Sequence, residues 1–159
     1  MRIIWTRAAF TAVLAAAAAP AWLSSQHTGL SPGVHAGYNL SDLNELVAGG
    51  HMIVYLPKRL ALYPGVTYYF VENGSLWDAH VTLRWVPARA SRIAPYIGAG
   101  LYWSRSSTGS ASATDVGLVG QVGAELLPGS WQPFAELQLL KDGAVSAQVL
   151  GGVRVVLRH

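Results

Sequence analysis

Residues 77–85, read Trp-Asp-Ala-His-Val-Thr-Leu-Arg-Trp, decide the fold of this chain. Apolar and polar side chains alternate along the whole stretch: Trp77, Ala79, Val81, Leu83 and Trp85 are apolar, and Asp78, His80, Thr82 and Arg84 are polar. Successive side chains of a β-strand point to opposite faces, so a strand here has one apolar face with Trp at both ends and one polar face. Eight steps of about 3.3 Å, tilted by about 40°, cover roughly 20 Å along a bilayer normal, close to the apolar band of a membrane-spanning barrel. The stretch therefore predicts a strand with its apolar face toward lipid and its charged face toward a barrel interior.

The composition agrees with a membrane protein built from strands. The chain has 159 residues, enough for one domain, and is 52% hydrophobic with only 12% charged residues. After the N-terminal region no apolar run approaches the roughly 18 to 20 residues that a membrane helix needs. Because there is no cysteine, disulfides and thiolate metal sites are excluded.

The N-terminal residues read as a secretory signal. Arg2 and Arg7 form a basic region, residues 8–19 an apolar region, and Ala19-Pro20-Ala21 a cleavage motif. We expect a signal peptide over 1–21, a short segment over 22–32 and a barrel over 33–159; the alternative, a retained anchor, has a short apolar run for a bilayer. Removing two arginines lowers the formal charge from +3 to +1, so the basic character of the precursor does not indicate a nucleic-acid partner.

The rest of the chain divides into short two-faced segments separated by turn residues. We predict strands over 33–40, 50–57, 60–70, 77–87, 94–105, 114–126, 131–140 and 145–157. Turn chemistry separates several of them, at 57–59, 73–74, 128–129 and 142–143. Short links imply antiparallel hairpins, and an even number of strands lets the last pair with the first. The predicted fold is all-β, an eight-stranded antiparallel up-and-down transmembrane β-barrel, with external loops at 41–49, 71–76, 106–113 and 141–144.

Several segments together resemble a known family. They are PYIGAGLYWS at 95–104, TDVGLVGQVGAEL at 114–126, QPFAEL at 132–137 and GGVRVVL at 151–157. The pattern resembles the small outer-membrane β-barrel proteins of Gram-negative envelopes, the eight-stranded OmpA-transmembrane-like group. The resemblance implies an outer-membrane location, contact with outer-membrane lipid and assembly by the barrel-assembly machinery. Members commonly end in an aromatic residue, whereas this chain ends Leu157-Arg158-His159.

Charged residues on the inward parity form the sharpest candidate site. The predicted interior polar network is Asp78, His80, Arg84, Asp115, Glu125, Glu136 and Arg154. An eight-stranded barrel is narrow enough for side chains to fill it, so we interpret these residues as structural, with Arg84 and Arg154 as partners of Glu125 and Glu136. The alternative is a narrow ion-conducting path lined by the same charges.

Aromatic residues form a second set with a shared parity. Tyr68, Trp77, Trp85 and Trp103 fall on the outward face, as membrane-interface belts require, whereas Tyr69, Tyr96 and Tyr102 fall on the inward face.

Catalytic and cofactor motifs are missing from the sequence. The five histidines show no HExxH spacing, there is no GxSxG, and Gly98-Ala99-Gly100 lacks the third glycine of a dinucleotide fingerprint. His35 and His80 could both point inward and approach each other or a carboxylate, but a hydrogen-bonded interior histidine is favoured over a ligand. We therefore predict no catalytic residues, no metal and no cofactor; an enzyme acting on lipid at the bilayer edge is the one enzymatic alternative.

The sequence favours an integral outer-membrane barrel with a structural or adhesion-type envelope role carried by its external loops. Two alternatives stay open: a narrow ion-conducting channel, and a soluble periplasmic barrel that binds lipid. The sequence identifies no external ligand.

Overall fold

The computed structural model describes residues 29–41, 44–87, 92–127 and 129–157. The predicted signal peptide and its cleavage site lie outside these residues. Within them, no helix is long and apolar enough to cross a membrane.

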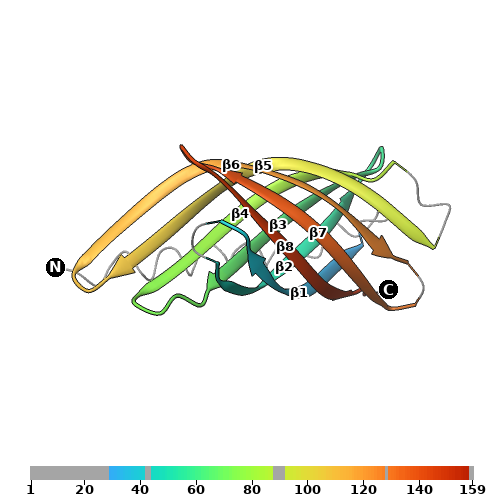
Figure 1. Ribbon diagram of the computed structural model, residues 1–159. Coiled ribbons are helices and arrows are strands. Elements are labelled where there is room, and N and C mark those ends of the chain that lie inside the picture. Colours follow the sequence, from blue (N-terminus) through green and yellow to red (C-terminus); the bar gives the residue numbers. More distant parts are fainter. Residues whose placement is uncertain (1–28, 42–43, 88–91, 128, 158–159) are drawn as a thin grey trace.

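Eight strands form one closed antiparallel barrel, in which each strand pairs with its sequence neighbours (Figure 1). The strands are β1 (Leu30–Asn39), β2 (Leu46–Leu56), β3 (Leu60–Tyr69), β4 (Ser75–Trp85), β5 (Ile93–Thr108), β6 (Ala111–Leu126), β7 (Trp131–Lys141) and β8 (Val145–Val155). The barrel closes through β1 and β8, which pair from Gly33 opposite Arg154 to Asn39 opposite Gln148. The predicted eight-stranded antiparallel barrel is confirmed.

The connections lie at two opposite ends. We call the end with the β1–β2, β3–β4, β5–β6 and β7–β8 connections the loop end, and the end with the other three the turn end. At the loop end the β5–β6 hairpin projects furthest beyond the barrel (Figure 1). Each of its strands has 16 residues, against 10 or 11 in the other six.

Two predicted loops are shorter in the structure. In both places backbone pairing with neighbouring strands extends a strand into a segment whose composition favours a loop. Residues 106–113, predicted as a flexible loop, continue as strand to a tip at 109–110, where Gly109 has a φ of 58°. The strand β2 begins at Leu46 instead of 50, since Gly49 pairs with both His35 and Thr67. Glycine is required there because an added Cβ would overlap the ring of His35.

The tight turns follow the predicted turn chemistry. Lys58 and Arg59 have φ values of 61° and 64° between β2 and β3. Two successive positive φ values are the signature of a type I′ turn, whose twist matches that of antiparallel strands. Gly74, Gly129 and Gly143, at three other predicted turns, also have positive φ.

Side chains are distributed inside out relative to a soluble protein. Apolar residues of the outward parity are exposed, for example Leu83 at 47% and Val122 at 52%, whereas charged residues of the inward parity are at most 3% exposed at Arg84, Glu125, Glu136 and Arg154. A soluble barrel would place its apolar side chains inside. This distribution is the one expected of a barrel whose outer surface meets lipid.

Candidate functional site

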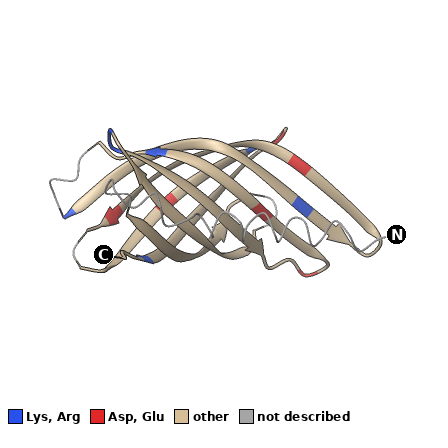
Figure 2. Cartoon of the chain, turned by 180° about the vertical axis from the view of Figure 1, so that it is seen from behind, with Lys and Arg blue, Asp and Glu red and all other residues tan. Residues whose placement is uncertain are grey.

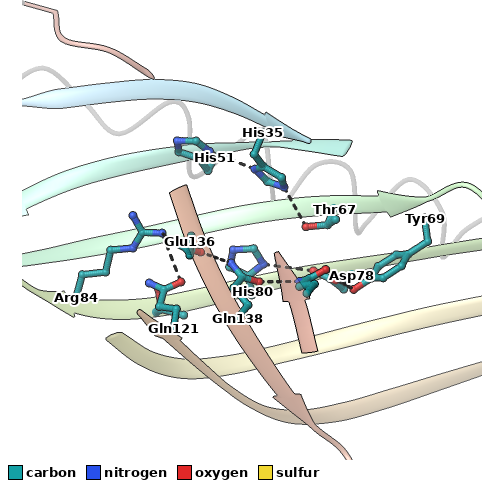
Figure 3. Close-up of polar contacts among 12 residues, drawn as sticks. His35, His51, Thr67, Tyr69, Asp78, His80, Arg84, Gln121, Glu136 and Gln138 are labelled. Carbon is teal, nitrogen blue, oxygen red and sulfur yellow. Dashed lines mark hydrogen bonds and ion pairs between the residues drawn. The ribbon is translucent and has the colours of Figure 1, made fainter. Parts of the chain in front are cut away.

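The centre of the lumen holds a network of polar contacts between side chains of β3, β4, β5, β6, β7 and β8, and Figure 3 shows part of it. Asp78 on β4 accepts a hydrogen bond from the Tyr69 hydroxyl at 2.6 Å and lies 3.3 Å from His80 Nδ1. The Tyr69 hydroxyl is also 3.4 Å from Gln148 Oε1 on β8. Gln148 donates to Gln138 at 2.7 Å, and Gln138 donates to Glu136 at 2.5 Å.

Arg84 and Glu136 form the central ion pair of this network. The guanidinium on β4 reaches the carboxylate on β7 at 2.5 Å, and the Tyr96 hydroxyl donates to the same carboxylate oxygen at 2.6 Å. Arg84 also lies over the rings of Tyr63 and Tyr96, with its Cζ 3.2 Å and 4.4 Å from the two ring centroids. In the amide orientation that satisfies its neighbours, Gln121 accepts from Arg84 and donates to Glu136. The guanidinium is therefore held by charge, hydrogen bonds and two aromatic faces.

A second ion pair lies nearer the turn end. Arg154 on β8 is 2.6 Å from Glu125 on β6, and the residue between them on β7, Gln132, accepts two hydrogen bonds from Arg154 at 2.9 and 2.6 Å. Both charged side chains are buried. Arg154 is therefore paired with Glu125, and Arg84 with Glu136.

His80 lies beside a carboxylate, that of Asp78, whereas among the residues that the structure describes His35 does not. His35 Nδ1 lies 3.3 Å from His51 Nδ1, and His35 Nε2 lies 3.2 Å from Thr67 Oγ1. The rings of His51 and His80 both stack with the ring of Tyr63, with centroid distances of 4.8 and 5.6 Å. Within the described residues, no group of three or more His, Cys, Asp or Glu side chains is placed to hold a metal ion.

Six of the seven predicted interior residues are buried in the lumen: Asp78, His80, Arg84, Glu125, Glu136 and Arg154. Asp115 is the exception, and its assignment to the interior was wrong. It has the inward parity and pairs with Ser104 on β5, but β7 pairs with β6 only from Leu118 onward. Asp115 therefore lies on the projecting hairpin, where no barrel wall surrounds it, and it is exposed.

Apolar clusters lie toward both ends of the lumen, on either side of the polar centre. Toward the loop end these are Val47, Tyr69 and Leu150, and Tyr102, Val119 and Leu140. Toward the turn end they are Ile53, Ala61 and Tyr63, and Val86, Ala94 and Tyr96. An ion crossing the barrel would have to pass these side chains as well as the closed polar network.

The outward aromatic residues gather at two levels of the barrel wall. Tyr68 and Trp77 are register partners toward the loop end, and Trp103 lies opposite Ala79 close by, whereas Trp85 is at the turn end of β4. Tyr68, Trp85 and Trp103 are exposed and Trp77 is half-buried. Trp131, 65% exposed at the turn-end start of β7, belongs with Trp85. The outward parity of Trp131 in the predicted strand 131–140 was the sequence signal that would have identified it as an interface residue.

The two ends differ in charge (Figure 2). Among the described residues, the turn end carries the exposed cations Lys58, Arg59 and Arg92. The loop end carries four acidic residues, Glu45, Glu72, Asp115 and Asp142, and two basic ones, Arg105 and Lys141. A basic turn end thus faces away from an acidic loop end.

A closed eight-stranded barrel with a polar lumen, an apolar wall and aromatic residues at two levels has the architecture of transmembrane β-barrels. Several solved structures are similar to it, among them the following three. The N-terminal β-barrel domain of Pseudomonas aeruginosa OprF matches with a TM-score of 0.70 and 11% identity, over 82% of this chain and 98% of that one. Neisserial surface protein A matches with a TM-score of 0.66 and 17% identity, over 83% and 98%. The attachment invasion locus protein Ail of Yersinia pestis matches with a TM-score of 0.53 and 15% identity, over 81% and 96%.

These similarities confirm the predicted resemblance at the level of the fold, which is that of the small eight-stranded outer-membrane barrels. No protein-family model matches the chain, and no curated protein matches it in sequence.

Proposed function

We propose that this chain is an integral outer-membrane protein whose barrel is a non-catalytic scaffold for its external loops, with a structural or adhesion-type role in the envelope. The observation that carries the proposal is the inverted distribution of side chains. Burying Arg84 and Arg154 while exposing Leu83 and Val122 is favourable only when the outer wall meets an apolar solvent. Lipid of the outer membrane is that solvent and the first partner of the protein.

The lumen supports a scaffold over either alternative function. A lipid-binding soluble barrel needs an apolar cavity, whereas this lumen is filled at its centre by paired charges and amides. A channel needs a continuous aqueous path, whereas Arg84 bridges β4 and β7.

The route to the outer membrane is part of the proposal. The N-terminal signal directs export and is removed near Ala21, and the barrel-assembly machinery then inserts the mature chain. The loop end faces the cell exterior. An adhesion-type role through this end is in line with the name of the attachment invasion locus protein, whose barrel is similar.

Cell fractionation tests the proposal. A Gram-negative host producing the chain should hold it in the outer-membrane fraction, and washing those membranes with carbonate or urea should leave it there. The folded barrel should also migrate differently from the boiled protein in a denaturing gel. Release into the wash, or recovery from the periplasm, contradicts an integral membrane protein.

A further inference from the structure

A cleft at the loop end has no role in the barrel scaffold described above. It has a volume of about 630 Å³ and lies between residues 44–46, the β3–β4 connection and the end of β5. Small-molecule sites have volumes of about 300–1,000 Å³. Val71 and Leu76 line the cleft and also pack on the lumenal cluster of Val47, Tyr69 and Leu150. The cleft therefore lies next to that cluster, on the side of the loop-end connections.

Backbone hydrogen bonds hold the walls of the cleft in place. Asn39 N–H donates to the Glu45 carbonyl at 2.8 Å, and Asn44 N–H donates to the Ser41 carbonyl at 3.0 Å. Phe70 N–H donates to the Leu46 carbonyl at 3.0 Å, which joins the β3–β4 connection to the start of β2. A site that is ordered before a ligand arrives loses less entropy on binding.

Apolar and polar residues together line the cleft. Its large exposed apolar residues are Tyr38, Leu46 and Phe70, at 39%, 63% and 58% exposure. Its polar residues carry hydroxyls (Ser75, Ser106, Ser107 and Thr108), amides (Asn44 and Asn73) and carboxylates (Glu45 and Glu72). Hydroxyl and amide groups both donate and accept hydrogen bonds, whereas an ionised carboxylate only accepts.

This composition selects the class of ligand. Of the described residues, those lining the cleft include two carboxylates and neither Lys nor Arg, so an anionic ligand is repelled. A purely cationic ligand donates to the carboxylates and to the hydroxyl oxygens, but it has no acceptor for the amide N–H donors of Asn44 and Asn73. A neutral sugar has hydroxyls that donate to carboxylates and accept from amides, and C–H faces that pack on aromatic rings.

Glu45 gives a second indication that the cleft binds a ligand with hydroxyl donors. Its Oε2 is buried and has no hydrogen-bond partner in the described part of the chain. A buried acceptor without a partner is unfavourable, and a hydroxyl donor in the cleft relieves that cost once the carboxylate turns toward it.

We propose that this cleft binds a short neutral oligosaccharide, with Tyr38 and Phe70 packing on sugar rings and Glu45 accepting from sugar hydroxyls. The inference deepens the proposed function and rests on it, because the loop end then presents a glycan-binding site to the cell exterior. It also sets this barrel apart from Ail, which has been crystallised with the heparin analogue sucrose octasulfate, a polyanion.

Titration of the purified full chain tests the inference. The barrel is folded in lauryldimethylamine oxide, whose headgroup contains no sugar, and titrated calorimetrically with maltotriose, cellotriose and tri-N-acetylchitotriose. We expect at least one of them to bind with a Kd on the order of 1 mM or tighter. Sucrose octasulfate should bind about tenfold more weakly or not at all, because its sulfates meet Glu45 and Glu72.

Variants locate the site. Glu45→Gln and Tyr38→Ala should each weaken binding about tenfold. Asp142→Asn, which removes a carboxylate of the same end outside the cleft, should bind as the unmodified chain does. If Glu45→Gln does not fold, Asn73→Ala replaces it, since Asn73 is exposed in the same cleft.

Three outcomes overturn the inference: none of the three sugars binds, binding is unchanged in both cleft variants, or spermine binds in the cleft more tightly than every sugar. Membrane integration is measured separately by the carbonate wash. A barrel that stays in the membrane but binds no sugar contradicts this inference alone, whereas a washed-out barrel contradicts the proposed function.

Discussion

At the scale of single residues, the barrel contains two buried ion pairs with different partners. Arg154 meets Glu125 and Gln132 only a strand or two away, whereas Arg84 reaches across to Glu136 and is packed between two tyrosine rings. In both pairs, removing one member leaves the other as an unpaired charge in the lumen.

Arg154→Met should therefore lower the stability of the barrel by about 3 to 5 kcal/mol. Adding Glu125→Leu should restore part of that loss, because the second change removes the unpaired carboxylate. Adding Glu136→Leu instead should deepen the loss, since Glu136 pairs with Arg84. Urea unfolding in lipid vesicles measures all three variants, and additive losses for Arg154→Met with Glu125→Leu would show that the two residues are not coupled.

The alternation of the sequence was sufficient to place these charges inward but not to pair them. Which carboxylate Arg84 reaches depends on register and on closure of the barrel, and neither is encoded by parity alone. Asp115 shows the same limit. Its parity is inward, yet the length of β6 beyond β7 takes it outside the barrel wall.

At the scale of the strand, the cost of an outward-facing charge should depend on its position along the barrel wall. Val122→Arg, on the outward face of β6 and opposite Ile97 and Leu137 in the middle of the wall, should cost about 2 to 4 kcal/mol in lipid. Ser112→Arg, near the tip of the β5–β6 hairpin, should cost almost nothing because that residue lies beyond the stretch of β6 that pairs with β7. Equilibrium unfolding of the two variants in vesicles compares them, and equal stabilities would mean that Val122 does not face lipid.

Neighbouring glycines of β2 offer a matched test of interior crowding. Gly49 faces inward, where an added Cβ would overlap His35 and the Val66 carbonyl; at Gly50 the nearest atom would be the Gly33 carbonyl oxygen, 3.7 Å away. Gly49→Ala should destabilise the barrel by about 1 to 3 kcal/mol. Gly50→Ala should be neutral or stabilise it by about 0.5 to 1 kcal/mol. Thermal or urea unfolding decides, and a Gly49→Ala variant as stable as the parent would rule out a packed interior at that point.

The strands themselves were predictable because each carries its own alternation and most are bounded by turn residues. The ends of β2, β5 and β6 were not, since Gly and Ser there favour loops locally and only cross-strand pairing extends the ladder. Long-range register decides such boundaries, and the segment 106–113 became strand for that reason.

At the scale of the whole molecule, the lumen is closed by side chains. Polar contacts span its centre and apolar clusters lie toward each end. Purified barrel in planar bilayers should therefore show no stable unitary conductance. Discrete steps that disappear in Glu136→Gln would assign the protein to the channels instead.

The brevity of the outer connections determines what an extracellular protease can reach. The basic residues of the loop end are Arg105, inside β5, and Lys141, the last residue of β7, and both are paired on two sides. Cleavage requires local opening, which a doubly paired strand resists. At the opposite end, Lys58 and Arg59 form an exposed tip. Trypsin added to intact cells should leave the barrel whole, and trypsin given access to the periplasm should cleave it. A surface protein of this shape therefore resists external proteases while its loop end stays accessible to ligands.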